Sequence, residues 1–436
     1  MTRTTRRWTS VQWPQVLSCG LFAALDRYFP WELFSAWQAP VAERRRRRYP
    51  PPVVVWAMVA QALLERTSDA GVCQWVATWL GVLCAPRSGA LAKARAALPA
   101  GLLRAAVRQV ASGIPRVRRR AFGKRPVQIV DATCATLADT AANQAAYPQP
   151  TGQRAGCGFP VVKLLVLMDA RSGAVVDWAC GTMTCSDTAL LRAVWERVSA
   201  GTVLVLDRGF ASHDFLAAAQ AQGIEPVVRQ HQRQLNRRPG QKLDWVEVWR
   251  QPQKRGEWWS PEHPAELRVR VIYSKLPNGT WLKLNTTLPK GQCPAAELVR
   301  LYRERWRIET QFRDLKQGQG LDLVAARTPA MVEKVILANL LALNLMAALR
   351  QDAAGRSAGE VWRVSLTSLR RGVVAARGLV GQSATAVWEW VLAMSYENPV
   401  PDDRHEPRVR KRRPKNYRLM TAPRDELRAA LNGGRA

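Results

Sequence analysis

Four polar residues recur at helical spacing near residue 300. Tyr302, Arg305, Glu309 and Lys316 are separated by 3, 4 and 7 residues. At about 100° per residue, their side chains fall within an arc of roughly 60° on one helix face. Two cations, a phenol and one carboxylate on one face suit an enzyme that holds a divalent metal against a nucleic-acid backbone. The alternative is a solvated helix face with a chance charge pattern.

Two upstream aspartates each close a short apolar run that reads as a strand. Asp131 ends the run from 127, and Asp207 ends the run from 203. With Glu309 they form a trio of carboxylates that suits two Mg²⁺ ions, because hard cations take oxygen ligands. One ion would activate a water or a 3′-hydroxyl while the other stabilises the leaving oxygen. Each aspartate alone could instead be an ordinary strand-end turn residue.

The elements that must position these residues follow from hydrophobic periodicity. We expect strands at 127–131, 161–168, 174–180, 203–207 and 224–228, and helices at 187–198, 212–222, 295–317 and 330–349. Three runs of period two, at 245–249, 267–273 and 281–285, indicate an antiparallel β insertion. An apolar stripe of Leu301, Ile308, Phe312 and Leu315 would dock the helix bearing Glu309 on the sheet. The predicted fold class is α/β, a mixed sheet flanked by helices.

The two ends of the chain are basic. Residues 1–120 are predicted to be helical, with an arginine run at 44–48 and a fresh helix at 53–66 after three prolines. The run at 44–48 is either a solvated segment or a DNA backbone contact. The tail from 408 contains Pro and many Lys and Arg residues, and we expect a flexible arm there.

The net charge of this chain indicates which kinds of partner it binds. Among 436 residues, 65 are Lys or Arg and 34 are Asp or Glu, which gives a formal charge of +31. Arg supplies most of the excess, and its planar fork binds phosphate in bidentate fashion, so the partner is expected to be a polyanion and first of all nucleic acid. An anionic membrane surface is the rival, but no long basic amphipathic helix stands apart.

Apolar runs and cysteines indicate the cellular compartment of the protein. The runs at 53–64 and 335–349 are shorter than the ~20 residues of a bilayer crossing, so we expect buried helices and no membrane. The apolar run at 16–25 is too short for a signal peptide. The eight Cys contain no C-x-x-C pair, which argues against zinc and fits buried thiols in a reducing compartment.

Together these motifs resemble a known family. Asp131 in Val-Asp-Ala-Thr, Asp207 in Asp-Arg-Gly-Phe, and the Tyr302, Arg305, Glu309 and Lys316 spacing resemble the DDE transposases of bacterial insertion sequences with the tyrosine-arginine-glutamate-lysine signature. The similarity spans about 125–350, with looser similarity at 50–66, 88–95 and 411–417. Ala132 stands where the family commonly has Gly.

The resemblance implies a ribonuclease H-like catalytic domain interrupted by the β insertion. The implied division is a helical basic DNA-binding domain at 1–120, the two parts of the catalytic domain at 121–230 and 291–350, the β insertion at 231–290, and a helical C-terminal region at 351–436 suited to dimerisation. It also implies two Mg²⁺ per site, with Mn²⁺ as a substitute, ligated by Asp131, Asp207 and Glu309. A cytoplasmic, nucleoid-associated protein is expected.

The implied activity is metal-dependent cleavage at transposon ends and strand transfer of the 3′-hydroxyl into target DNA, in some members through a DNA hairpin. The partners would be double-stranded DNA, as transposon ends and target, and a second copy of the chain. Tyr302, Arg305 and Lys316 would bind backbone phosphates, and we expect Arg208 and Arg313 to bind DNA as well. A Trp of the β insertion would stack on a flipped base. The candidates are Trp245, Trp249, Trp258, Trp259 and Trp281. We favour Trp258 and Trp259, although core packing is the more common role of any one Trp.

Two other functions compete with this prediction. A non-catalytic DNA-binding protein would use the same basic charge, but it gives no reason for three acids to coexist. A ribonuclease H-like DNA nuclease would cut without joining.

Overall fold

The computed structural model describes residues 24–37, 49–64, 67–79, 88–115, 122–123, 125–231, 243–276, 279–356, 360–376, 379, 382–396 and 420–433. The arginine run at 44–48 and the basic tail at 408–417 lie outside these residues.

A mixed sheet forms the centre of the molecule. Its order is β3 (Val175–Thr182), β2 (Val161–Asp169), β1 (Val127–Leu137), β4 (Val203–Leu206), β5 (Glu225–Arg229), β8 (Trp281–Thr286), β7 (Glu266–Lys275) and β6 (Asp244–Arg250). Strands β1, β2 and β3 are antiparallel, whereas β1, β4 and β5 are parallel. A short strand β9 (Leu323–Val324) joins the far end of β1. The predicted α/β fold class, a mixed sheet flanked by helices, is confirmed.

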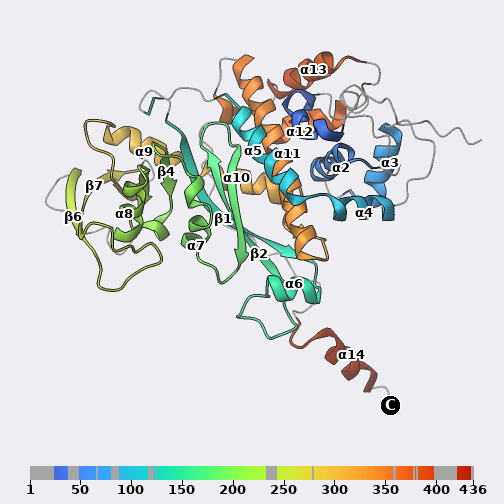
Figure 1. The fold of residues 1–436 in the computed structure, drawn as a ribbon, viewed down its shortest axis with the longest axis horizontal. Helices are drawn as coiled ribbons and strands as arrows, with labels where there is room; N and C mark the ends of the chain where they lie inside the picture. The colour runs from blue at the N-terminus through green and yellow to red at the C-terminus, as the bar shows by residue number, and fades with distance from the viewer. Residues whose placement is uncertain are drawn as a thin grey trace, which may run out of the picture.

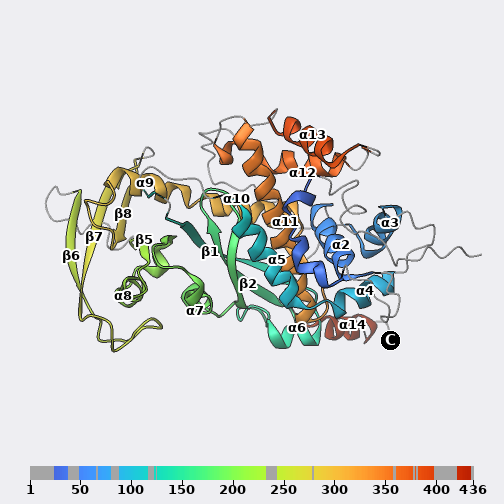
Figure 2. The same ribbon diagram turned by 45° about the horizontal axis from the view of Figure 1, so that its top comes forward.

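The predicted antiparallel insertion is also present. Strands β6, β7 and β8 pair antiparallel to one another. They do not form a separate sheet, because β8 pairs with β5 and so continues the central one. Figures 1 and 2 show these strands at the end of the molecule away from the N-terminal helices.

Two hydrophobic clusters cover the two faces of the sheet. The larger one joins β1 and β2 to α5 (Ala100–Gly113), α10 (Arg307–Arg313) and α11 (Pro329–Arg356). The other includes side chains of α7 (Asp187–Arg192) and α8 (His213–Ala221). Alternate residues of β1 enter different clusters, Ile129 the first and Val130 the second, as the period of a strand requires.

The N-terminal and C-terminal helices lie on the same side of the molecule as α11 (Figures 1 and 2). They are α2 (Pro51–Leu63), α3 (Asp69–Trp79), α4 (Ser88–Ala97), α12 (Leu366–Ala375) and α13 (Ala384–Tyr396). One cluster of buried residues runs from Ala24 to Leu392 and includes both groups. The described part of 1–120 is helical, as predicted, but it shares its core with the sheet, and the division into domains stays a prediction. Two short helices, α6 (Ala141–Ala146) and α14 (Arg424–Gly433), lie at the edge of the molecule.

Helix α11 is longer than the sequence predicts, so its length does not argue against a membrane crossing. It has 28 residues, not the 20 predicted for 330–349, and is long and apolar enough to cross a membrane. In its most apolar window 89% is buried inside the protein. A core helix of a folded protein is buried in this way. The predicted buried helix is therefore supported by its burial and not by its length.

Two other boundaries differ from expectation. Strand β1 continues six residues beyond Asp131, because β2 and then β9 pair with the extension. The helix expected at 187–198 ends at Arg192 and is followed by a 3₁₀ turn, η4 (Trp195–Arg197). The cysteines among the described residues are free, with Cys73 and Cys293 buried.

Candidate active site

The segment that carries Glu309 is not one helix. It consists of α9 (Ala295–Glu304), α10 and a π-helical turn, η7 (Asp314–Gly318). At the first junction the backbone tightens, because Ile308 N donates to Arg305 O at 3.2 Å and Glu309 N donates to Trp306 O at 3.0 Å. The predicted continuous helix at 295–317 is therefore wrong, since periodicity alone does not register such tightened turns.

The predicted apolar stripe nevertheless docks this segment. Leu301, Ile308, Phe312 and Leu315 are all buried, with at most 8% of any one exposed. They join the cluster that covers β1. Glu309 thus lies on a segment packed against the strand that carries Asp131.

Two acids of the predicted trio meet at Arg305. Its Nη1 donates to Asp131 Oδ2 at 2.9 Å, and its Nη2 donates to Glu309 Oε1 at 3.3 Å. The Arg305 side chain is only 16% exposed. One guanidinium therefore joins strand β1 to helix α10.

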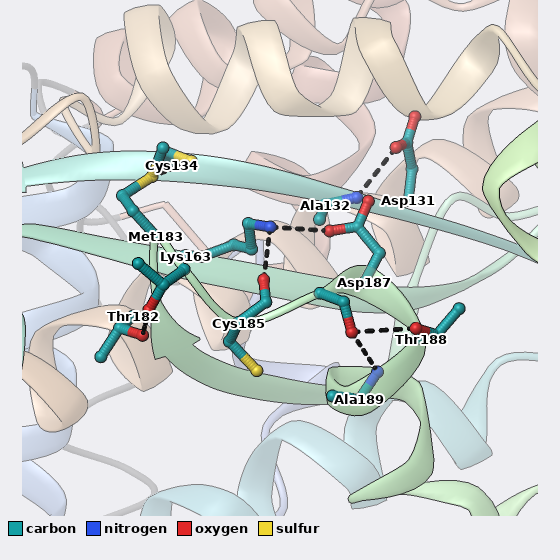
Figure 3. Close-up of polar contacts among 12 residues, drawn as sticks. Asp131, Ala132, Cys134, Lys163, Thr182, Met183, Cys185, Asp187, Thr188 and Ala189 are labelled. Atoms are coloured by element: carbon teal, nitrogen blue, oxygen red, sulfur yellow. Dashed lines mark hydrogen bonds and ion pairs between the residues drawn. The ribbon is translucent and has the colours of Figure 1, made fainter. Parts of the chain in front are cut away.

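Sheet register brings the third acid alongside. Strands β1 and β4 pair in parallel, with Val127 opposite Val203 and Ile129 opposite Val205. The same offset places Asp207, which directly follows β4, level with Asp131. Asp131 also accepts a hydrogen bond from Ala132 N at 2.9 Å (Figure 3). The Ala at this position therefore fits the local backbone.

The charges at this point are strongly coupled. Burial raises the pKa of Asp131, Arg305 opposes that rise, and Asp207 and Glu309 add to it. Burial works against the charge of Arg305, but Tyr302 and the three acids raise its pKa. Burial also raises the pKa of Tyr302 to about 12. The three carboxylates are close enough to repel one another, and a cation relieves that repulsion.

The three acids do not form a closed metal site in this structure. Among the described residues, no three acidic, His or Cys side chains meet as a metal-binding group. Arg305 lies between two of the predicted ligands instead, and the assignment of the trio as metal ligands stays a prediction. The donor set itself fits, because carboxylate oxygens are the ligands that Mg²⁺ prefers.

The predicted DNA-binding residues occupy different environments. Tyr302 is only 7% exposed. Lys316 lies half-buried in the π-helical turn, and its charge lowers the pKa of Cys134 against the larger effect of burial. Arg208 and Arg313 are exposed. The four residues of the motif therefore differ in exposure. Tyr302 is buried, Arg305 bridges two acids, and only part of the motif's positive charge is open to solvent.

The two predicted stacking tryptophans differ. Trp258 is 6% exposed, and its ring lies 4.7 Å from that of Trp195 and 5.2 Å from that of Phe215. It packs in the core, so in this conformation it is not available to a base. Trp259 is half-buried with Arg255 over its ring at 3.9 Å.

Three residues of this region were missed from the sequence. Trp306, directly between Arg305 and α10, is 50% exposed. Arg229 ends β5, and its charge reaches Tyr302. Lys163 of β2 donates to Asp187 at 3.0 Å and to Cys185 O at 2.7 Å (Figure 3). Arg229 could have been recognised in the sequence from its position, because it ends the strand next to the one that precedes Asp207.

The chain is similar in sequence to known transposases. A sequence profile described as "Transposase DDE domain" matches residues 122–345. The transposase InsG for insertion sequence element IS4 of Escherichia coli (strain K12) is 28% identical over 216 residues, 48% of each chain. The transposase for insertion sequence element IS421 of Escherichia coli is 39% identical over 79 residues, 17% of this chain and 21% of that one.

A solved structure, the piggyBac transposase synaptic complex with hairpin DNA, aligns with 92% of this chain and 84% of that one. Its TM-score is 0.42 at 10% identity. The chain spans about half the length of the IS4 relative and about a fifth of the IS421 relative. The profile covers both parts of the sheet, the insertion between them and the Glu309 segment, more than half of the chain, and on this ground the chain belongs to the Transposase DDE domain family.

Proposed function

We propose that this protein is a DNA transposase that cleaves transposon ends and joins the 3′-hydroxyl to target DNA. One observation carries the proposal. Asp131 and Glu309 share the guanidinium of Arg305, with Asp207 level with Asp131 on the neighbouring parallel strand. This arrangement lies inside the segment that matches the transposase domain.

Asp131, Asp207 and Glu309 would hold the divalent metal, Mg²⁺ or in its place Mn²⁺, with two ions per site. When bound, these ions activate the attacking oxygen and stabilise the leaving one. The protein's own part is to hold the three carboxylates together, through the two neighbouring strands and the docked α10. The metal preference and stoichiometry are part of the proposal.

Cationic side chains would hold the DNA backbone. Arg305 and Lys316, with the exposed Arg208 and Arg313, are proposed to contact phosphates, and Tyr302 to set the position of Arg305. Arg binds phosphate through two parallel hydrogen bonds, which fixes orientation as well as affinity. Trp259 and the exposed Trp306 offer ring surface to a displaced base.

The assembly is proposed to contain two protein copies, because two transposon ends must be brought together. The partners are the terminal inverted repeats of the element and a target duplex, in the bacterial cytoplasm at the nucleoid. A hairpin on the transposon end is one route for cutting the second strand.

The test uses purified protein, Mg²⁺ or Mn²⁺, and labelled DNA carrying the inverted repeats that flank the gene. Wild type is expected to nick these ends and join them to a plasmid, and Glu309→Gln to lose at least about 1000-fold in nicking rate. Glu297→Gln is the matched control, since Glu297 lies in α9 and pairs with Arg300 at 2.6 Å.

If wild type and Glu309→Gln nick equally, or neither does, the proposal fails. Nicking without joining identifies a nuclease. Metal-independent, salt-sensitive binding without nicking identifies a DNA-binding protein.

A further inference from the structure

Gln311 occupies an unusual place on the segment that carries Glu309. It follows Glu309 by two residues in α10, so its side chain points to the opposite side of the helix. Gln311 is 2% exposed, and its Nε2 donates to Gly173 O at 2.7 Å. This bond joins α10 to the turn between β2 and β3, 138 residues away in sequence.

The turn that receives Gln311 is held from several sides. Asp169 Oδ1 accepts hydrogen bonds from Arg171 N and Ser172 N at its start. Trp362 of η8 (Val361–Arg363) donates from Nε1 to Ala170 O at 3.0 Å. Gly173 O is thus presented by a braced loop and not by a free hairpin tip.

The contact requires glycine at position 173. Gly173 has φ of +76°, a conformation that side-chain-bearing residues rarely adopt. A Cβ there would lie 2.3 Å from Gln311 Nε2, closer than atoms approach one another. The turn and Gln311 therefore fit each other at short range.

We propose that Gln311 is a positioning residue that fixes the axial place and rotation of α10, so that the Glu309 carboxylate lies level with Asp131. The proposal rests on the proposed function of the same site. The apolar stripe sets the distance of α10 from the sheet, but apolar contacts are non-directional and leave rotation and sliding open. A directional bond on the far side of the helix removes both.

The central variant is Gln311→Met, which keeps the volume and removes the donor. Gln311→Asn keeps the amide on a side chain one methylene shorter. Gln351→Met is the control, because Gln351 lies in α11 and not on the Glu309 segment, and its buried Oε1 has no hydrogen-bond partner among the described residues. Circular dichroism and thermal melting establish that each variant is folded.

Three quantities are measured on the folded proteins: Mn²⁺ affinity from the electron paramagnetic resonance signal of free Mn²⁺, the single-turnover nicking rate, and the Kd for end DNA without metal. For Gln311→Met and Gln311→Asn we expect Mn²⁺ affinity to fall about tenfold and nicking about 10- to 100-fold. End-DNA Kd stays within about twofold, because the cationic contacts are untouched. Raising Mn²⁺ restores part of the lost rate.

Failure of this inference and failure of the proposed function give different results. If wild type nicks and binds Mn²⁺ through Glu309, and both Gln311 variants match it within about twofold, positioning by Gln311 is overturned. Loss of end-DNA binding in parallel with nicking also overturns it, because that pattern means general damage. If wild type itself neither binds Mn²⁺ nor nicks, the proposed function is wrong and the inference falls with it.

Discussion

Two consecutive helical regions of this protein are built in opposite ways. Helix α11 runs unbroken from Pro329 to Arg356 and is buried over most of its length. The segment before it, from α9 through η7, is divided into three short pieces and keeps charged groups on one side. Regular backbone bonding lets α11 serve as the core, whereas the divided segment aims individual side chains and depends on contacts from outside to stay in place.

The contrast extends to buried polar groups. In α11, Asn344 is fully buried and bonds both backbone groups of Val175, so its polarity supports the sheet. In the divided segment, Gln311 and Arg305 bond groups that set the position of an acid. Substitutions in α11 should therefore change stability, and substitutions around the divided segment should change activity at nearly constant stability.

The largest effect is expected for Asn344→Leu. Asn344 also donates to Val107 O at 2.9 Å, so the change leaves three buried backbone groups without this partner. We expect the free energy of unfolding to fall by about 4 kcal/mol, measured by urea denaturation. Asn339→Leu is the control, because its amide bonds a carbonyl of its own helix, Val335 O. Equal losses in the two variants would contradict the comparison.

Arg370→Met tests the support of the divided segment. Arg370 of α12 donates from Nη1 to Gly318 O, at the end of the π-helical turn that carries Lys316. Its loss frees that turn, and we expect nicking to fall about tenfold with about 1 kcal/mol lost in stability. The exposed neighbour gives the control Arg371→Met. Unchanged nicking in Arg370→Met would show that the turn needs no outside support.

Trp306→Ala probes the junction of α9 and α10. Because Trp306 is half-exposed, stability should change by less than about 0.5 kcal/mol. End-DNA affinity should fall about fivefold if the ring meets a base. Trp281→Ala, which removes a Trp 36% exposed and stacked on Tyr273, should leave affinity unchanged. The two affinities are compared by fluorescence anisotropy, and equal losses would argue against a special role for the junction.

The smallest effect concerns pH and the helical layer on α11. Burial raises the pKa of Asp26 from 3.8 to about 6, opposed by the hydrogen bond from Trp31. The folded state then holds a proton that the unfolded state has lost, so stability falls as pH rises from about 4 to about 6 and is level above. Because the group is partly exposed, the loss should be only about 1 kcal/mol.

Asp26→Asn should abolish this dependence, since Asn accepts the same bond without charge. Thermal melts at pH 4, 5, 6 and 7, in about unit steps, provide the measurement. A wild-type curve parallel to that of the variant would remove Asp26 as the titrating group. Nicking should not follow this profile, because Asp26 lies in the layer beyond α11 and away from the divided segment.

The features of the fold and the site that could be predicted are those that depend on the local sequence pattern. Strands 203–207 and 127–131 were recognisable as apolar runs closed by acids, and the parallel pairing of β1 with β4 then places Asp131 and Asp207 level. The stripe of Leu301, Ile308, Phe312 and Leu315 likewise predicted which side of the segment is buried, because burial follows helical spacing whether or not the helix is broken.

The parts that sequence could not predict depend on distant partners. The division of the segment coincides with contacts from Gly173 and Arg370, which are 138 and 52 residues from their partners. The burial of Trp258 depends on Trp195 and Phe215, which no local spacing connects to it. Arg305 reads as a phosphate ligand on its helix face, and only the sheet brings Asp131 within its reach.

The pairing of Arg305 with Asp131 also sets an order of events during synthesis. These residues are 174 positions apart, and a ribosome adding about 5–20 residues per second needs about 9–35 s to cover that distance. Strands β1 to β5 are already made when the insertion begins to emerge, with the edge of β5 still waiting for β8. The nascent chain therefore carries an open sheet edge until β8 is made, and Asp131 and Asp207 have no Arg305 or Glu309 beside them until the later segment is made. The group of three carboxylates is thus completed late in synthesis.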